Sequence, residues 1–210
     1  MKNLLSKNLI ILLLAVLAAS SGFIWPQQEK EFVEPWEERH NRLQPPVKIM
    51  DAMGLKPGMV IGDIGAGRGR FTVWFADRVG DNGKVYANDI VEKYLRNIEH
   101  RCQRLGFTNV TTCLGTVVEP NIPDKVLDIA FMINVYHHLD KPVELIKNLI
   151  PTLKPDGTLV IVEHDPVKSG YRTESTSKEQ LVKQANQAGY KLVRMETFLA
   201  RDNIYFLKKK

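Results

Sequence analysis

The hydrophobic positions of this chain change their period along its length. Short apolar runs typical of buried strands occupy residues 60–64, 84–89, 110–114, 127–134 and 158–164. Between most of these runs, apolar residues recur at helical spacing, as over 71–79, where Phe71, Phe75 and Val79 share one face. Strands that alternate with helices in this way predict a doubly wound α/β sheet.

Further helices are predicted over residues 47–54, 93–105 and 142–153. Gly54 closes the first of them, and Pro142 suits the first turn of the last. The sequence KPDG at 154–157 is expected to turn the chain into the strand over 158–164.

The chain closes with a helix that Ser177 caps, which ends near Gly189, and with two strands over 191–198 and 203–208. Only a few residues, LARD, separate these strands. A parallel crossover needs a dozen or more residues, so the two strands must be antiparallel neighbours. We therefore expect a mostly parallel sheet with one reversed strand near its edge.

The first 22 residues follow a different pattern, with Lys2 and Lys7 before an apolar run and small residues after it. This order is typical of a secretory signal. The run is short for a membrane span of about 20 residues, although its extension to Trp25 allows an uncleaved anchor. Lysines precede the run and glutamates follow it, so the domain is expected outside the cytoplasm. We expect a signal peptide or N-terminal membrane anchor over 1–22, a linker with a surface helix over 23–42, and a folded domain over 43–210.

Composition adds little to this picture. Hydrophobic residues make up 44% of the 210 positions and charged residues 25%, as in ordinary globular proteins. The net charge of +5 is not gathered into a basic stripe, so nucleic acid is not an expected partner. Membrane contact is expected only through the N-terminal segment, if it stays uncleaved. The two cysteines, Cys102 and Cys113, lack a metal-binding spacing and are interpreted as free thiols, with a disulfide as the alternative.

The glycine-rich stretch VIGDIGAGRGRF over 60–71 is the main candidate for chemistry. In open α/β sheets, ligands bind beyond the carboxyl ends of the strands. A phosphate-binding P-loop would need Lys followed by Ser or Thr where Arg70 and Phe71 stand. A dinucleotide-binding loop would place its third glycine at position 70, whereas it falls at Gly69, which disfavours NAD without excluding it.

Two carboxylates point to a third ligand. Asp63 ends the first strand and suits an ammonium group, whereas Asp89 ends the second and can accept both ribose hydroxyl protons. S-adenosyl-L-methionine carries both groups. Its methionine part would meet the loop and its ribose would meet Asp89.

Together with VYANDI, NVYHHL and LKPDGTLVIVEHD, this stretch resembles the class I S-adenosylmethionine-dependent methyltransferases over roughly residues 43–207. The resemblance implies a Rossmann-like seven-stranded sheet of order 3-2-1-4-5-7-6 with strand 7 antiparallel. It also implies the cofactor S-adenosyl-L-methionine. The cofactor-binding residues it implies are Asp63, Gly65, Ala66, Gly67, Gly69, Asp89, Ile90, Gly115, Thr116 and Asn134. Thr116 departs from the family, because many members carry Asp there.

Methyl transfer is an in-line displacement that needs a base only when the acceptor is protonated. His137 and His138 are the candidate catalytic residues, and Tyr136, His164 and Asp165 also follow strand ends. No metal site is expected. The stretch over 163–165 either binds an acceptor or caps a loop.

The fourth strand lacks the Asn/Asp-Pro-Pro-Tyr signature of nucleic-acid and amide methylation. The methyl acceptor can therefore be a small molecule, a lipid or a protein side chain. Two other functions remain open. One is an exported accessory protein that binds the cofactor without turnover, and the other is an NAD-dependent oxidoreductase, which Arg70 disfavours.

Overall fold

The structure is a computed structural model that describes residues 32–170 and 175–210. The chain divides into two units, Met1–Val33 and Glu34–Lys210, and the account below concerns the second. The predicted signal peptide or anchor over 1–22 lies outside the described residues, as does the start of the predicted linker. Within the described ranges, no helix combines the length and the apolar character needed to cross a membrane.

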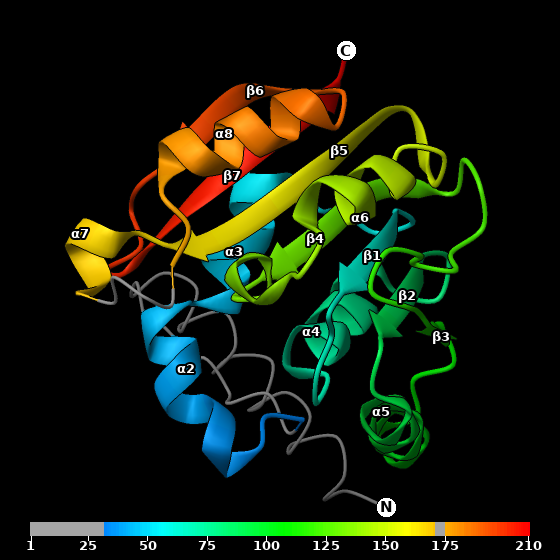
Figure 1. The fold of residues 1–210 in the computed structure, drawn as a ribbon. Helices are drawn as coiled ribbons and strands as arrows, with labels where there is room; N and C mark the ends of the chain where they lie inside the picture. The colour runs from blue at the N-terminus through cyan, green and yellow to red at the C-terminus, as the bar shows by residue number, and fades with distance from the viewer. Residues whose placement is uncertain (1–31, 171–174) are drawn as a thin grey trace, which may run out of the picture. The chain divides into compact units, whose positions relative to one another are not determined.

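Seven strands form one sheet in the order β3-β2-β1-β4-β5-β7-β6 (Figure 1). They are β1 (Val60–Ile64), β2 (Lys84–Asp89), β3 (Val110–Leu114), β4 (Leu127–Ile133), β5 (Leu153–His164), β6 (Tyr190–Glu196) and β7 (Asp202–Lys209). Strands β1 to β5 pair in parallel, whereas β7 runs antiparallel to both β5 and β6. The predicted strand order and the reversed seventh strand are confirmed.

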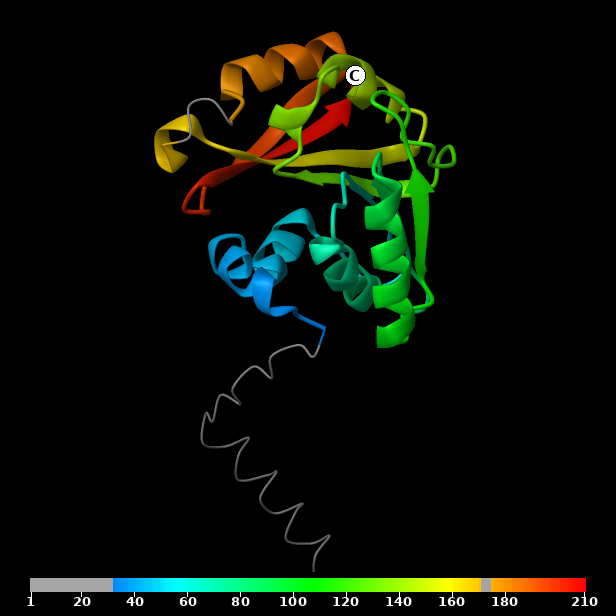
Figure 2. The same ribbon diagram turned by 60° about the horizontal axis from the view of Figure 1, so that its bottom comes forward.

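Helices cover both faces of the sheet. They are η1 (Pro35–Glu37), α2 (Glu38–Leu43), α3 (Pro46–Met53), α4 (Arg70–Val79), α5 (Glu92–Leu105), η2 (Tyr136–His138), α6 (Pro142–Asn148), α7 (Pro166–Ser169) and α8 (Lys178–Gln187). Figure 2 shows α6 and α8 on one face of the sheet and α3 and α4 on the other. Helix α5 packs against β2 and β3. This is the doubly wound arrangement that the alternating pattern predicts.

The helix ends follow local rules that are legible in the sequence. Gly54 ends α3 in the left-handed conformation with φ of 68°, where a residue without Cβ is favoured. Ser177 precedes α8, and its hydroxyl accepts a hydrogen bond from the Gln180 amide. Both predicted boundaries are confirmed.

One predicted boundary is wrong. The helix expected over 142–153 ends at Asn148, and β5 begins at Leu153 instead of residue 158. Pro151 has no amide proton and cannot continue a helix, so the apolar spacing beyond it is not helical. The KPDG segment runs within β5, and the Lys154 ammonium bonds the Asp128 carboxylate on β4 at 2.8 Å.

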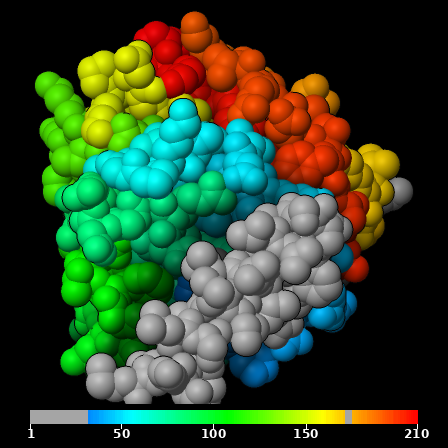
Figure 3. All heavy atoms as spheres, turned by 180° about the vertical axis from the view of Figure 1, so that it is seen from behind, coloured from blue at the N-terminus to red at the C-terminus, as the bar shows by residue number. Residues whose placement is uncertain are grey.

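The central strand β4 packs against helix α4 through aromatic side chains. Phe131 on β4 meets Phe71 and Phe75 of α4, with ring centroids 5.1 and 5.0 Å apart respectively. On the face opposite to the view of Figure 1, the surfaces of α3 and β6 adjoin (Figure 3), and the Arg194 guanidinium donates to the Ala52 carbonyl. This packing fixes the carboxyl ends of the parallel strands, where the predicted site lies.

Candidate functional site

The glycine loop after β1 is held by the neighbouring strand. The amides of Gly65 and Ala66 both donate to the Asn88 carbonyl on β2, at 2.9 and 2.8 Å. Gly65 has φ of 72°, and a Cβ there would lie 2.6 Å from Cγ2 of Val135. Only glycine fits this position, because a side chain would meet both backbone strain and a collision.

Gly67 faces open space instead. It has φ of 55°, and a Cβ added to it would have no atom within 4 Å. Gly69, at the start of α4, differs again, because its Cβ would lie 2.8 Å from Cγ1 of Ile98. A ligand can therefore approach the main chain at Gly67, while Gly65 and Gly69 allow the loop to pack closely on the protein.

Asp89 at the tip of β2 is held in place by two backbone amides. Its Oδ2 accepts from the Gly67 amide at 2.8 Å and its Oδ1 from the Val91 amide at 2.9 Å. Each carboxylate oxygen retains a second lone pair. The side chain is thus oriented by the loop and can still accept two hydroxyl protons from a ligand.

Asp89 lines a cavity of about 320 Å³, here called the β2 cavity. Its lining includes Gly65, Asp89, Ile90, Tyr94, Thr116, Val117, Val135, His138 and Asp140. Ile90 is 58% exposed although it is a large apolar residue. An apolar wall beside an oriented carboxylate suits a flat base attached to a ribose.

Thr116 lines the β2 cavity, and Gly115 precedes it directly after the end of β3. A Cβ on Gly115 would lie 2.6 Å from Nδ2 of Asn88, which donates to the Cys113 and Pro120 carbonyls at 3.1 and 2.8 Å. The Thr116 hydroxyl oxygen accepts from the Glu119 amide at 2.9 Å. Its proton remains available for donation, so this side chain suits a ring nitrogen better than an amino group.

Asp63 lies behind the loop. It is 2% exposed, and its Oδ2 accepts from the Thr72 hydroxyl of α4 at 2.7 Å. Burial raises the pKa of Asp63 to about 6, against the opposing effects of the Thr72 hydrogen bond and the Arg70 charge. Asp63 is absent from the lining of the β2 cavity and joins β1 to α4, so its predicted contact with an ammonium group stays a prediction.

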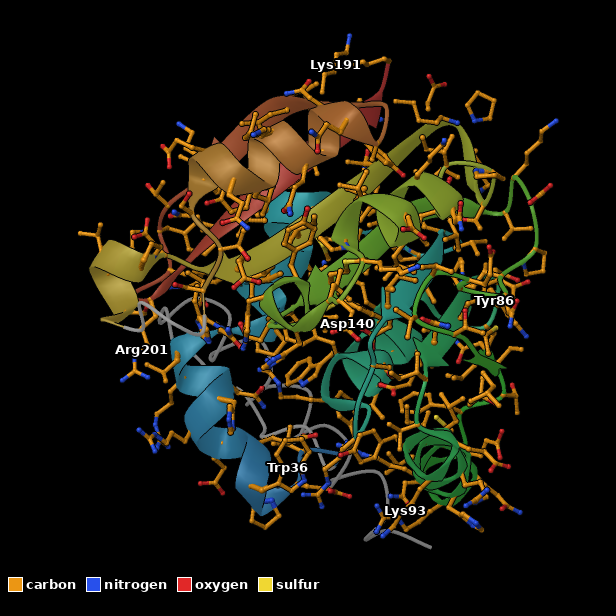
Figure 4. All side chains as sticks on the ribbon, in the orientation of Figure 1. Trp36, Tyr86, Lys93, Asp140, Lys191 and Arg201 are labelled. Carbon is orange, nitrogen blue, oxygen red and sulfur yellow. The ribbon has the colours of Figure 1, made fainter. Side chains whose placement is uncertain are left out.

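A second cavity of about 260 Å³ lies beside the end of β4 and is here called the α2 cavity. Its lining residues are Arg39, His40, Leu43, Gln44, Asn134, His164, Arg201 and Asp202. Figure 4 labels one residue of each cavity, Asp140 of the β2 cavity and Arg201 of the α2 cavity. The predicted site residue Asn134 lines this second cavity. Val135 and His138, which follow it in the sequence, line the β2 cavity.

A chain of polar side chains holds α2 over this end of the sheet. The side-chain Oδ1 of Asn134 accepts from Nε2 of Gln44 at 3.0 Å, and Oε1 of Gln44 accepts from Arg70 at 2.6 Å. Burial lowers the pKa of Arg70 to about 10. Asn134 itself has φ of 54°, a conformation that asparagine tolerates better than most residues.

The residue before α2 is tied down by a buried ion pair. Arg101 of α5 donates to both carboxylate oxygens of Glu37, at 2.7 and 3.0 Å. Sequence reasoning missed Gln44, Glu37 and Arg101. A charged and amide-rich stretch far from the glycine loop gives no local signal that its side chains reach the site.

The structure separates the histidines that the sequence places in one run. His137 is buried, with its Nδ1 2.6 Å from Oε1 of Glu163 on β5. His138 lines the β2 cavity, and its ring centroid lies 4.0 Å from that of His137. No group of three metal-ligating side chains occurs among the described residues.

The other strand-end candidates have structural contacts. The Tyr136 hydroxyl donates to Gln184 of α8 at 3.1 Å, and Asp165 caps α7 by accepting from the Val167 and Lys168 amides. For Asp165 the loop-capping interpretation therefore fits.

Two acid–histidine pairs lie side by side at the ends of β5 and β7. Beside the His137–Glu163 pair, Nδ1 of His164 lies 2.7 Å from Oδ1 of Asp202. Burial raises the pKa of Glu163 to about 7, and the hydrogen bond with Asp202 raises the pKa of His164. Sequence reasoning missed Asp202, since it lies 38 residues from His164 and meets it only through strand pairing.

The cysteines Cys102 and Cys113 are both buried and free, as predicted. Burial raises the pKa of the Cys102 thiol to about 11. Neither thiol lines one of the two cavities.

Comparison with known proteins identifies the family of this site. The family described as "Methyltransferase domain" matches residues 55–204. A ubiquinone/menaquinone biosynthesis C-methyltransferase UbiE from Hydrogenovibrio crunogenus is 32% identical over 122 residues, which cover 56% of this chain and 47% of the relative. A demethylmenaquinone methyltransferase from Anoxybacillus flavithermus is 26% identical over 59% of this chain and 52% of its own length. The chain thus spans about half the length of these relatives.

Solved structures agree on the fold. A S-adenosylmethionine-dependent methyltransferase from Aquifex aeolicus is 25% identical, with a TM-score of 0.75 over 83% of this chain and 93% of that one. The family match covers more than half of the chain, and the strand order is the one that the family resemblance implies. The chain therefore belongs to the class I S-adenosylmethionine-dependent methyltransferases.

Proposed function

We propose that this protein transfers a methyl group from S-adenosyl-L-methionine to an acceptor that enters by the α2 cavity. The observation that carries the proposal is the oriented carboxylate of Asp89, which lies next to the open main chain at Gly67. When bound, S-adenosylmethionine would supply an electrophilic methyl group.

In this proposal each wall of the β2 cavity meets one part of the cofactor. Asp89 accepts the ribose hydroxyl protons, and Ile90 packs against the adenine, with Thr116 of the lining and the neighbouring Gly115 at its edge. The methionine part lies along the main chain of Gly65, Ala66 and Gly67. Gly69 lets α4 begin close to this loop, and Asp63 supports it from behind.

Asn134 lies where the proposed methyl-donor site in the β2 cavity adjoins the proposed acceptor site in the α2 cavity. It lines the α2 cavity, whereas Val135 and His138 line the β2 cavity. The chain's contribution to catalysis is to hold an acceptor atom in line with the sulfonium methyl group across this boundary. His137 is paired with Glu163 and His138 lines the β2 cavity, so neither lines the α2 cavity, and their catalytic role stays a prediction.

The cofactor site is tested by calorimetry of the full chain with S-adenosylhomocysteine. Replacement Asp89→Ala removes a charged acceptor of two hydrogen bonds, each worth about 1.5–3 kcal/mol, so we expect affinity to fall at least about 100-fold. The matched control is Asp81→Ala in the exposed turn before β2, which should bind as the wild type does. Equal affinity of the Asp89 variant and the wild type would refute the ribose assignment.

Turnover is tested with a labelled methyl group on S-adenosylmethionine and fractions of envelope and cytosol as acceptors. Incorporation that the Asp89→Ala variant lacks supports the enzyme. Tight binding without incorporation into any fraction would favour the non-catalytic accessory protein instead.

We also propose that the chain is exported through residues 1–22, as a cleaved signal peptide or an N-terminal membrane anchor. Support comes from the basic, apolar and small-residue order of this segment. A C-terminal fusion to a reporter that is active only outside the cytoplasm tests this. Activity should disappear when residues 1–22 are deleted, and an inactive full-length fusion would contradict export.

A further inference from the structure

The α2 cavity raises a question that the cofactor site leaves open, namely what kind of acceptor needs these particular side chains. The answer rests on the proposed methyl transfer and concerns its second substrate. We propose that His164, positioned by Asp202, is the catalytic base and that the acceptor is a small phenol bearing an acidic group.

The first support is the geometry of the His164–Asp202 pair. His164 ends β5 and Asp202 begins β7, and the two residues are direct partners in the antiparallel pairing. The Asp202 side chain is 1% exposed, and its Oδ1 lies 2.7 Å from Nδ1 of His164. An ionised carboxylate only accepts hydrogen bonds, so Nδ1 carries the proton and the lone pair of the neutral ring is on Nε2.

The second support is the placement of the ring. The His164 side chain is 18% exposed and lines the α2 cavity, together with Asn134. By contrast, the His137–Glu163 pair is almost fully buried, with side-chain exposures of 7% and 0%. Of the two acid–histidine pairs, the His164–Asp202 pair is therefore the one whose members line the acceptor side.

The charges around His164 come from several elements. Asp202 on β7 and Glu163 on β5 favour the protonated ring, whereas Arg201 and burial disfavour it, and together they raise the pKa of His164. The His137 ring stacks at 5.5 Å, and Arg39 and His40 of α2 share the cavity lining. A raised pKa makes the neutral imidazole a stronger base toward the hydroxyl proton of an acceptor.

His164 is the one base that the proposed reaction needs. As the acceptor oxygen bonds to the methyl carbon, the carbon–sulfur bond breaks and its electron pair stays on sulfur. The hydroxyl proton passes to Nε2 of His164, and the imidazolium is stabilised by the Asp202 carboxylate. Solvent then takes the proton from His164, which restores the neutral ring.

The lining of the α2 cavity defines the acceptor. A phenolic hydroxyl has a pKa of about 10 and must lose its proton, whereas a neutral amine can attack with its lone pair. Two guanidinium groups, Arg39 and Arg201, favour an anionic substituent. Among the described residues that line the cavity, Leu43 alone is apolar, so this lining suits a small polar ring rather than an isoprenoid chain.

The test uses the full chain and two acceptors that differ in the acidity of the hydroxyl group. These are 4-hydroxybenzoate, which is protonated at the hydroxyl, and 3-nitro-4-hydroxybenzoate, which is ionised there at neutral pH. Replacement His164→Gln should lower kcat/KM about 100- to 10,000-fold for the first acceptor. It should lower kcat/KM less than about 10-fold for the second, because no proton has to be removed.

Three further measurements separate a base from a structural role. The wild-type rate with 4-hydroxybenzoate should fall with one proton as the pH drops through the pKa of His164, and the His164→Gln variant should lose this dependence. Asp202→Asn should lower the rate more with 4-hydroxybenzoate than with 3-nitro-4-hydroxybenzoate. His100→Gln on α5, an exposed histidine outside both cavities, should behave as the wild type.

The proposal is overturned if kcat/KM falls by the same factor for both acceptors in the His164→Gln variant, or if the variant keeps wild-type activity. It is also overturned if neither phenol is methylated while labelled methyl enters other acceptors. Failure of the proposed methyl transfer gives a different result, with no binding of S-adenosylhomocysteine and no incorporation into any fraction.

Discussion

The two cavities on either side of the segment over 134–138 are built in different ways. The β2 cavity lies at the tips of adjacent parallel strands and the glycine loop, and side chains of α5, the segment over 135–140 and α6 complete its lining. The α2 cavity combines side chains from α2, β4, β5 and β7, which lie far apart in the sequence. Both cavities need the assembled sheet, but the β2 cavity includes a loop and strand ends that the sequence marks locally.

This difference predicts how the two regions respond to change. In the β2 cavity, glycine positions and one carboxylate determine whether a ligand fits, so substitutions should act on cofactor affinity. In the α2 cavity, side chains hold one another through hydrogen bonds, so substitutions should act on stability and turnover.

The largest expected effect comes from Gly65→Ala in the loop of the β2 cavity. Left-handed backbone costs about 1–2 kcal/mol for a residue with Cβ, and the collision with Val135 adds about 1–3 kcal/mol. We expect a loss of about 3 kcal/mol in the free energy of unfolding, measured in urea, and at least about 100-fold weaker binding of S-adenosylhomocysteine.

Gly54→Ala is the matched control for that substitution. Gly54 has a similar φ of 68°, but its Cβ would have no atom within 4 Å. The Gly54→Ala variant should lose only about 1 kcal/mol in the free energy of unfolding and bind S-adenosylhomocysteine as the wild type does. Equal losses in the two variants would show that the collision with Val135 does not matter.

A smaller effect is expected from Gln44→Ala in the α2 cavity. Gln44 is 3% exposed and bonds both Arg70 and Asn134, so its removal leaves the buried Arg70 with one bond fewer. The free energy of unfolding should fall by about 2 kcal/mol. Methyl transfer should fall more than the affinity for S-adenosylhomocysteine, whereas the exposed control Gln103→Ala should change neither.

The smallest effect is a pH dependence of stability that comes from two buried carboxyl groups, neither of which lines the β2 cavity or the α2 cavity. Burial raises the pKa of Glu163 from 4.5 to about 7, and that of Asp63 from 3.8 to about 6. At pH values between the ordinary pKa and the raised pKa of each group, the folded state holds the proton more tightly than the unfolded state. The stabilisation is therefore complete at the lower pH and lost as the pH rises through the folded pKa.

For Glu163 this predicts that the wild type loses about 1–2 kcal/mol more stability than Glu163→Gln between pH 5 and pH 7. For Asp63 the corresponding loss, relative to Asp63→Asn, should be nearly complete by about pH 6. Urea unfolding at several pH values measures both. A wild-type stability that rises over these windows relative to the variants would contradict the raised pKa values.

Much of the fold and of the β2 cavity could be predicted from the sequence because their signals are local. The apolar runs give the strands, and the short LARD connection gives the reversed strand. Glycines next to strand ends give the loop, and Asp89 follows from its position at the end of β2. The exception is β5, where apolar spacing across Pro151 was interpreted as a helix although proline cannot continue one.

Little of the α2 cavity could be predicted in the same way. His164 was recognisable as a strand-end residue, but its partner Asp202 depends on the register of β5 with β7. Gln44 depends on the packing of α2 against Arg70, and an amide in a polar stretch has no pattern that marks this contact. Such long-range pairs follow from the completed sheet and not from periodicity.

Asn88 has a consequence for how the protein meets its ligand. Its carbonyl holds the Gly65 and Ala66 amides, and its side chain reaches the carbonyls of Cys113 and Pro120. One residue thus fastens the segments that follow β1 and β3 to the tip of β2 before any ligand arrives. We therefore expect the proposed cofactor surface to be preorganised, so that little conformational entropy is lost when a ligand binds.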